Sequence, residues 1–173
     1  MGPVFLSWLD NATCRVFAAL SIMCFAMLAF GIYLQHSSGL EPCPMCIVQR
    51  YAFIFIASVA ALAAASAKKS VHLTGSVLLI LGAGFGVFVA ARQSWLQWYP
   101  PQMSTCGRDF YGMIESFPLN RAIPMIFKGS GDCSAVDWTF LGGSIANWAF
   151  VTFTLITLLA LLVIWRIVIR HGV

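Results

Sequence analysis

The chain has 173 residues, of which 60% are hydrophobic and only 9% are charged, and its formal net charge is +4. So few charged side chains exclude an ordinary water-soluble domain, and the modest positive charge does not indicate nucleic-acid binding. We therefore expect an all-α membrane protein in which residues 1–173 form a single integral membrane domain.

Four apolar stretches are long enough to cross the roughly 30 Å hydrocarbon core of a bilayer. The expected helices span about residues 16–34, 47–67, 71–91 and 145–165. The first is too long for the apolar part of a signal peptide and lacks a convincing cleavage site, so we expect an uncleaved anchor. The sequence therefore predicts a four-transmembrane-helix bundle with outer loops at about 35–46 and 92–144.

The positive charges near the helix ends predict the orientation. Arg15, Lys68, Lys69, Arg166 and Arg170 all lie next to one set of helix ends, whereas residues 35–46 contain neither Lys nor Arg. Short cytoplasmic loops are enriched in these residues. We therefore expect both termini to be cytoplasmic, with the two loops at about 35–46 and 92–144 facing outward.

The first outer loop ends in a C-x-x-C pair, Cys43 and Cys46, and the flanking prolines bias Cys43 away from helix. A disulfide across so short a ring stabilises a protein by only about 2 kcal/mol in the chain-entropy model, against about 3.5 kcal/mol for a loop of the Cys106 to Cys133 size. A helix N-terminus beside Cys46 would stabilise its thiolate. The pair is therefore better suited to redox chemistry than to holding the fold together.

Arg50 follows Cys46 by four residues and so lies on the same face of the second predicted helix. A permanent charge at that depth is costly unless it has a partner. The Cys46 thiolate or a carbonyl oxygen of a bound redox molecule could serve. The alternative is that the side chain only extends to the membrane interface.

The second outer loop is too long for a simple connector, and loops of this length tend to be functional. Its middle, residues 113–127, mixes apolar with charged side chains and contains two prolines, which favours a short helix or turn on the membrane surface. Cys106 and Cys133 bracket this segment. A bridge between them could be redox-active or purely structural.

The four cysteines in the outer loops allow three interpretations. A zinc site is disfavoured because Cys106 and Cys133 are too far apart in sequence to form a second C-x-x-C pair. Two structural disulfides in an inert four-helix membrane protein, or two redox-active disulfides acting in series, remain open. We expect Cys14 and Cys24, which lie in or near the first helix, to have no redox role.

Several motifs resemble the disulfide bond formation protein B (DsbB) family, the bacterial inner-membrane thiol oxidases that use a quinone. The resemblance covers nearly the whole chain. It includes the C-x-x-C pair followed by Arg50, the segment Leu96 to Pro100, Gly129 to Cys133, and Trp138 to Gly142. One possible departure is Gln93, where some members have a histidine, so the resemblance supports no histidine-assisted step.

The resemblance implies a protein dithiol:quinone oxidoreductase in the bacterial inner membrane, with redox loops in the periplasm. Its disulfides would be Cys43–Cys46 and Cys106–Cys133. A thioredoxin-like DsbA-type partner would attack Cys106, and the electrons would pass through Cys133, Cys43 and Cys46 to ubiquinone or menaquinone, held with the help of Arg50. The resemblance implies no metal site.

Overall fold

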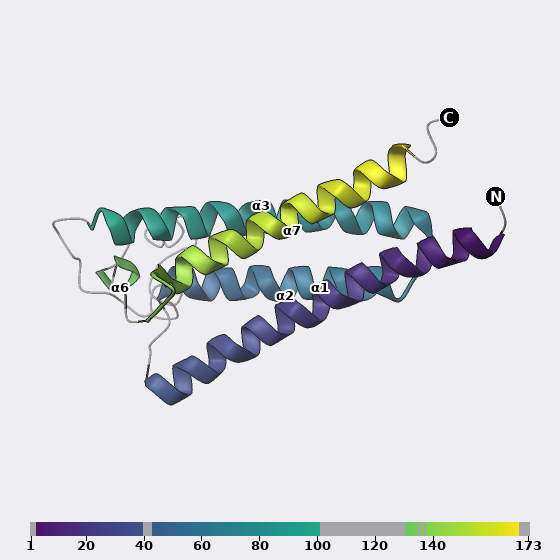
Figure 1. Cartoon of the computed structure of the whole chain (residues 1–173). Coiled ribbons are helices and arrows are strands. Elements are labelled where there is room, and N and C mark those ends of the chain that lie inside the picture. The colour runs from purple at the N-terminus through teal and green to yellow at the C-terminus, as the bar shows by residue number, and fades with distance from the viewer. Residues whose placement is uncertain (1–2, 40–42, 101–130, 135, 137, 170–173) are drawn as a thin grey trace, which may run out of the picture.

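A computed structural model of the chain describes residues 3–39, 43–100, 131–134, 136 and 138–169. Four long helices make up most of this described part, and they run along the long dimension of the molecule (Figure 1). Their bounds are Pro3–Ser38 for α1, Pro44–Ala64 for α2, Lys69–Trp98 for α3 and Ile145–Ile169 for α7. Each is long and apolar enough to cross a membrane. The chain is therefore a four-helix membrane protein, as predicted.

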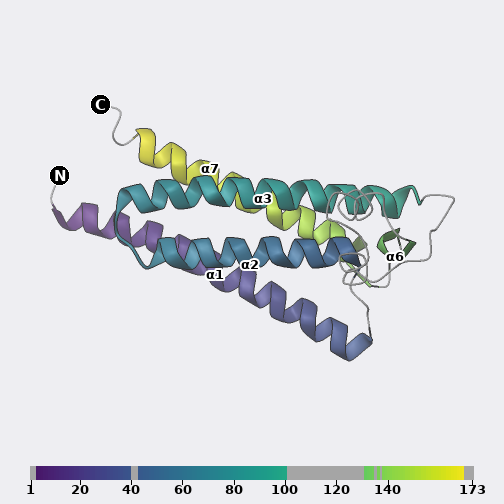
Figure 2. The ribbon, with the colours of Figure 1, turned by 180° about the vertical axis from the view of Figure 1, so that it is seen from behind.

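The two ends of the bundle differ. The start of α1, the α2–α3 connection and the end of α7 lie at one end (Figures 1 and 2). The short helix α6, Gly131–Ser134, lies at the other together with a two-stranded hairpin, and we call this the hairpin end. Cys106 and the membrane-surface helix expected within 113–127 lie outside the described residues.

The helix ends depart from the expected ones for local reasons. The α2 helix begins at Pro44 rather than near residue 47, because a proline at the first helical position loses no hydrogen bond. The Cys43 sulfur then caps the helix by accepting a hydrogen bond from the backbone N–H of Cys46 at 3.3 Å. The α3 helix continues to Trp98 rather than ending near residue 91, because the next proline is Pro100.

Close helix packing at small residues builds the core. The α3 helix packs against both α2 and α7, while α1 packs against α2. A Cβ atom added at Gly86 of α3 would lie 2.6 Å from the ring of Phe153 on α7, so only glycine fits there. Small residues allow such approaches between membrane helices. Toward the hairpin end α1 diverges from α2 (Figures 1 and 2).

The hairpin consists of β1, Thr139–Phe140, and β2, Gly143–Ser144, paired antiparallel. Both turn residues have positive φ, 50° at Leu141 and 78° at Gly142, as a type I′ turn requires. Hydropathy did not predict this hairpin. The Ser144 hydroxyl accepts a hydrogen bond from the backbone N–H of Asn147 at 3.3 Å, so the hairpin leads directly into a capped α7.

Candidate functional site

Cys43 and Cys46 lie at the hairpin end, at the start of α2. Cys43 has extended backbone, as its flanking prolines predict, and Cys46 lies in the first helical turn. Their sulfur atoms are 2.9 Å apart, longer than the roughly 2.05 Å of a disulfide bond. The structure therefore records both as thiols. The Cys43–Cys46 disulfide stays a prediction.

A third sulfur reaches this pair from α6. Cys133 is fully buried and belongs to the same apolar cluster as Cys43. A hydrogen bond between these two thiols, followed by the bond to Cys46 and by burial, raises the pKa of Cys43 well above its ordinary value. Three of the four predicted redox cysteines thus lie together. The Cys106–Cys133 disulfide stays a prediction, because Cys106 is outside the described residues.

An amide from α3 faces the same sulfurs. The side-chain NH₂ group of Gln93 donates to the Cys46 sulfur at 3.2 Å and to the Cys43 sulfur at 3.4 Å. The Gln93 oxygen in turn accepts a hydrogen bond from Gln49 Nε2 at 2.8 Å. Gln93 thus supplies a donor at the position where a histidine was considered.

Sequence reasoning missed this amide pair, although a weak signal was present. Gln49 follows Cys46 by three residues, so it shares a face of α2 with the thiol. Gln93 and Gln97 are four residues apart and share a face of α3, but only once the helix is continued beyond residue 91. Because the third helix was predicted to end near residue 91, Gln93 and Gln97 were not recognised as lying on one helical face.

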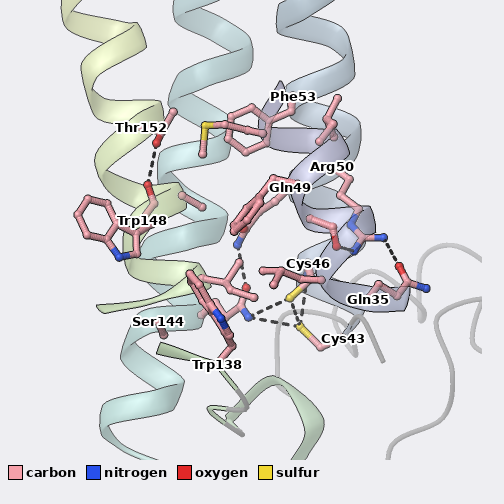
Figure 3. A pocket seen from close by; sticks show the side chains of 18 of the residues that line it. Gln35, Cys43, Cys46, Gln49, Arg50, Phe53, Trp138, Ser144, Trp148 and Thr152 are labelled. Atoms are coloured by element: carbon pink, nitrogen blue, oxygen red, sulfur yellow. Dashed lines mark hydrogen bonds between the residues drawn. The ribbon is translucent and has the colours of Figure 1, made fainter. Parts of the chain in front are cut away.

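Arg50 is turned toward α1, as Figure 3 shows. Its Nη1 donates to the side-chain oxygen of Gln35 at 2.8 Å, and its Nη2 lies 3.5 Å from the carbonyl oxygen of Gly31. Both partners are neutral oxygens. The described hydrogen-bond partners of the Cys46 sulfur are Gln93 and Cys43 instead. Of the two partners considered for Arg50, the Cys46 thiolate is therefore not the one that it contacts here.

A cavity of about 320 Å³ lies between α1, α2, α3, α7 and the hairpin. Its walls are largely aliphatic and aromatic, and they include Phe53, Trp138 and Trp148 (Figure 3). The edge-to-face contact of Trp138 with Phe30 of α1, at 6.0 Å between ring centres, closes one side. Cys43, Cys46, Arg50 and four glutamines bring polar atoms to this apolar space; the glutamines are Gln35, Gln49, Gln93 and Gln97. Such a cavity suits a flat apolar ring with polar atoms on its edge.

The two remaining cysteines lie elsewhere. Cys24 is fully buried in the helix core, where it packs as a small apolar residue. Cys14 lies at the opposite end of the bundle, and its thiol donates to the carbonyl oxygen of Ser66 at 3.5 Å. Neither contacts the sulfur cluster at the hairpin end.

Comparison with known proteins agrees with this geometry. The family model described as "Disulfide bond formation protein DsbB" matches residues 13–163. A disulfide bond formation protein B from Albidiferax ferrireducens is 67% identical over 168 residues, covering 97% of each chain. One from an Acidovorax species is 66% identical, covering 93% of this chain and 92% of the relative. A third, from an Azoarcus species, is 53% identical and covers 84% of this chain and 89% of the relative.

Proposed function

The chain belongs to the DsbB family of disulfide bond formation proteins, and we propose that it oxidises a periplasmic DsbA-type dithiol protein and passes the electrons to a membrane quinone. Because it belongs to this family and has four helices that can cross a membrane, the chain is a multi-pass membrane protein and a disulfide-forming oxidoreductase. The partner, the electron acceptor and the residue roles below are the proposal.

The residues around the cavity fit a quinone. Aromatic and aliphatic side chains can hold an apolar ring, and a guanidinium such as that of Arg50 donates readily to a carbonyl oxygen. The positive charge of Arg50 faces only neutral oxygens among its described hydrogen bonds, so it remains available to a polar ligand atom. A bound quinone, whether ubiquinone or menaquinone, would supply a two-electron acceptor strong enough to oxidise a partner near about −120 mV.

Every step carried out by the protein is attack of a thiolate on a disulfide. A partner thiolate attacks Cys106 of the Cys106–Cys133 disulfide; this bond breaks, a mixed disulfide forms, and Cys133 leaves as a thiolate. Cys133 then attacks Cys43, so that a Cys43–Cys133 bond forms and Cys46 is released as a thiolate. The hydrogen bond between the Cys133 and Cys43 thiols supports this second transfer.

The cycle closes in two further steps. The second partner thiolate attacks the mixed disulfide, which releases the oxidised partner and the Cys106 thiolate. Cys106 attacks Cys133, which restores the Cys106–Cys133 bond and leaves Cys43 and Cys46 as a dithiol. Loss of two electrons and two protons from this dithiol restores the Cys43–Cys46 bond. The partner dithiol is oxidised overall. Cys46 is the point of electron exit because it is the sulfur released when Cys43 is attacked, and it lines the cavity.

The observation that carries the proposal is the cluster of three thiols directly beside the cavity. The test is to mix the purified protein with a quinone and a reduced DsbA-type protein, following quinone absorbance and partner thiols. We expect one quinone consumed for each partner disulfide formed. Two inert structural disulfides predict no consumption, and a zinc site predicts stoichiometric metal in the purified protein.

A cysteine variant supplies the control. Cys106→Ser should abolish turnover with the partner, because the first attack has lost its target. The Cys43–Cys46 disulfide should still form, and mass spectrometry of trapped thiols would detect it. Full turnover in this variant would contradict the proposed order of attack.

A further inference from the structure

Two glutamines are buried beside the sulfur cluster: Gln93 contacts the sulfurs, and Gln49 contacts Gln93. Gln49 and Gln93 are only 4% and 3% exposed. A buried amide is costly unless its polar atoms are hydrogen-bonded. Here Gln49 Nε2 donates to the Gln93 oxygen, and the NH₂ group of Gln93 is directed at sulfur, which is otherwise a weak acceptor.

The pair has a defined direction. Gln49 presents its NH₂ group to Gln93, so the oxygen of Gln93 must face Gln49 and its own NH₂ group must face the sulfurs. With Gln49 placed in this way, the opposite orientation of Gln93 would set its oxygen against the sulfurs and leave two NH₂ groups facing each other. Gln49 therefore determines which end of the Gln93 amide reaches Cys46.

A sulfur becomes a much better acceptor when it is ionised, because hydrogen bonds to charged groups are about twice as strong as neutral ones. The shorter of the two contacts goes to Cys46, and Cys46 also lies in the first turn of α2, where the helix dipole favours negative charge. Arg50, the cation expected in this role, is turned toward Gln35 of α1.

We propose that Gln93 is a positioning residue that stabilises the Cys46 thiolate with a neutral hydrogen-bond donor, and that Gln49 acts only through Gln93 by holding the amide in that orientation. A neutral donor stabilises the thiolate without the full neutralisation of a cation, so the sulfur keeps more of its nucleophilicity. This inference rests on the proposed function in one respect: Cys46 is the sulfur released when Cys43 is attacked.

The test measures Cys46 directly and needs neither quinone nor partner. The full-length protein is purified, reduced and freed of reductant, and the rate of N-ethylmaleimide addition to Cys46 is followed from pH 5 to pH 10 by fragment mass spectrometry. In Gln93→Leu we expect Cys46 to react about tenfold more slowly at neutral pH, with the midpoint of its profile moved to higher pH, because the donor to the thiolate is lost.

Gln49→Leu tests the orientation without altering Gln93 or adding a charge. It removes the donor that holds the Gln93 oxygen, so the Gln93 amide is no longer held with its NH₂ group toward the sulfurs. We expect the Cys46 profile to move in the same direction as in Gln93→Leu. In the Gln93→Leu background a Gln49→Leu change should add nothing, because residues that act through one another are not additive.

Ser76→Ala is the matched control for loss of a buried polar group on α3. Ser76 is fully buried, and its hydroxyl has no hydrogen-bond partner in the described part of the chain. This variant should leave the Cys46 profile unchanged. A Gln93→Leu profile that superimposes on that of the parent protein would overturn the proposal, as would a Gln49 effect that persists without Gln93. If quinone turnover fails but the Cys46 shifts appear, the proposed function is wrong and this inference stands.

Discussion

Arg50 brings a positive charge to the cavity and also links two helices. Its guanidinium joins α2 to Gln35 of α1 while lining the cavity. In Arg50→Met the charged donor for a ring carbonyl is lost, and hydrogen bonds to charged groups contribute about 1.5–3 kcal/mol. We expect the KM for quinone to rise at least tenfold, measured by stopped-flow absorbance.

Gln35→Leu separates the two roles of Arg50. This variant removes the link to α1 but keeps the positive charge at the cavity, so we expect a smaller rise in KM than in Arg50→Met. The thiol–disulfide exchange between protein partner and cysteines should survive in both variants. Unchanged quinone affinity in Arg50→Met would exclude a binding role for the guanidinium.

Cys43 should react slowly with electrophiles in the reduced protein. Its hydrogen bonds with Cys133 and Cys46, together with burial, raise its pKa above the ordinary value of 9.0. A raised pKa means that the neutral thiol persists at pH 8, and only the thiolate reacts. We expect maleimide to modify Cys43 at least tenfold more slowly at pH 8 than an unstructured cysteine peptide, as measured by mass spectrometry. The rate should still be rising with pH at pH 9, because the raised pKa keeps much of the thiol neutral there. Rapid labelling of Cys43 at pH 7 would contradict this prediction.

At the scale of helices and strands, hydropathy predicted the four long helices but not where they end. Apolar length depends on bilayer thickness, whereas the ends depend on local features such as Pro44 at the start of α2 and Pro100 after α3. The hairpin escaped prediction because Leu141, which adopts positive φ, is not a typical turn residue.

The candidate site also contains residues that the sequence predicted and residues that it did not. The spacing of Cys43 and Cys46 predicted a redox pair, and the structure places the two sulfurs 2.9 Å apart. The proximity of Cys133 to Cys43 was implied only by resemblance to a family, since chain separation says nothing about contact across two loops. Gln93 was noticed only as a departure from a family pattern, because its function depends on a tertiary contact with α2 that no spacing in α3 reveals.

The contact between α3 and α7 gives a test of packing with a matched control on one helix. A Cβ atom at Gly86 would overlap the Phe153 ring, whereas at Gly84 it would meet nothing within 4 Å. Overpacking a core typically costs about 1–3 kcal/mol. We expect Gly86→Ala to lower the thermal unfolding temperature in detergent, and Gly84→Ala to leave it unchanged or raise it slightly. Equal behaviour of the two variants would show that α3 and α7 do not pack so closely.

For the whole molecule, the two ends of the bundle carry different chemistry. The hairpin end holds the thiol cluster and the cavity. The opposite end holds exposed Lys68 in the α2–α3 connection and exposed Lys69 at the start of α3. Lysines in short loops remain on the cytoplasmic side during insertion. This asymmetry predicts that the hairpin end faces the periplasm, where disulfides persist.

Single cysteines at the two ends test this orientation. Lys68 is exposed at one end and Val136 at the hairpin end, so each can carry a reporter thiol in a chain whose native cysteines are replaced by alanine or serine. A membrane-impermeant maleimide should label Val136→Cys in intact cells, and Lys68→Cys only after the membrane is permeabilised. The reverse pattern would place Cys43, Cys46 and Cys133 on the reducing side, where thiols are kept reduced. An oxidant of periplasmic proteins could not work there, so this result would contradict both the orientation and the proposed function.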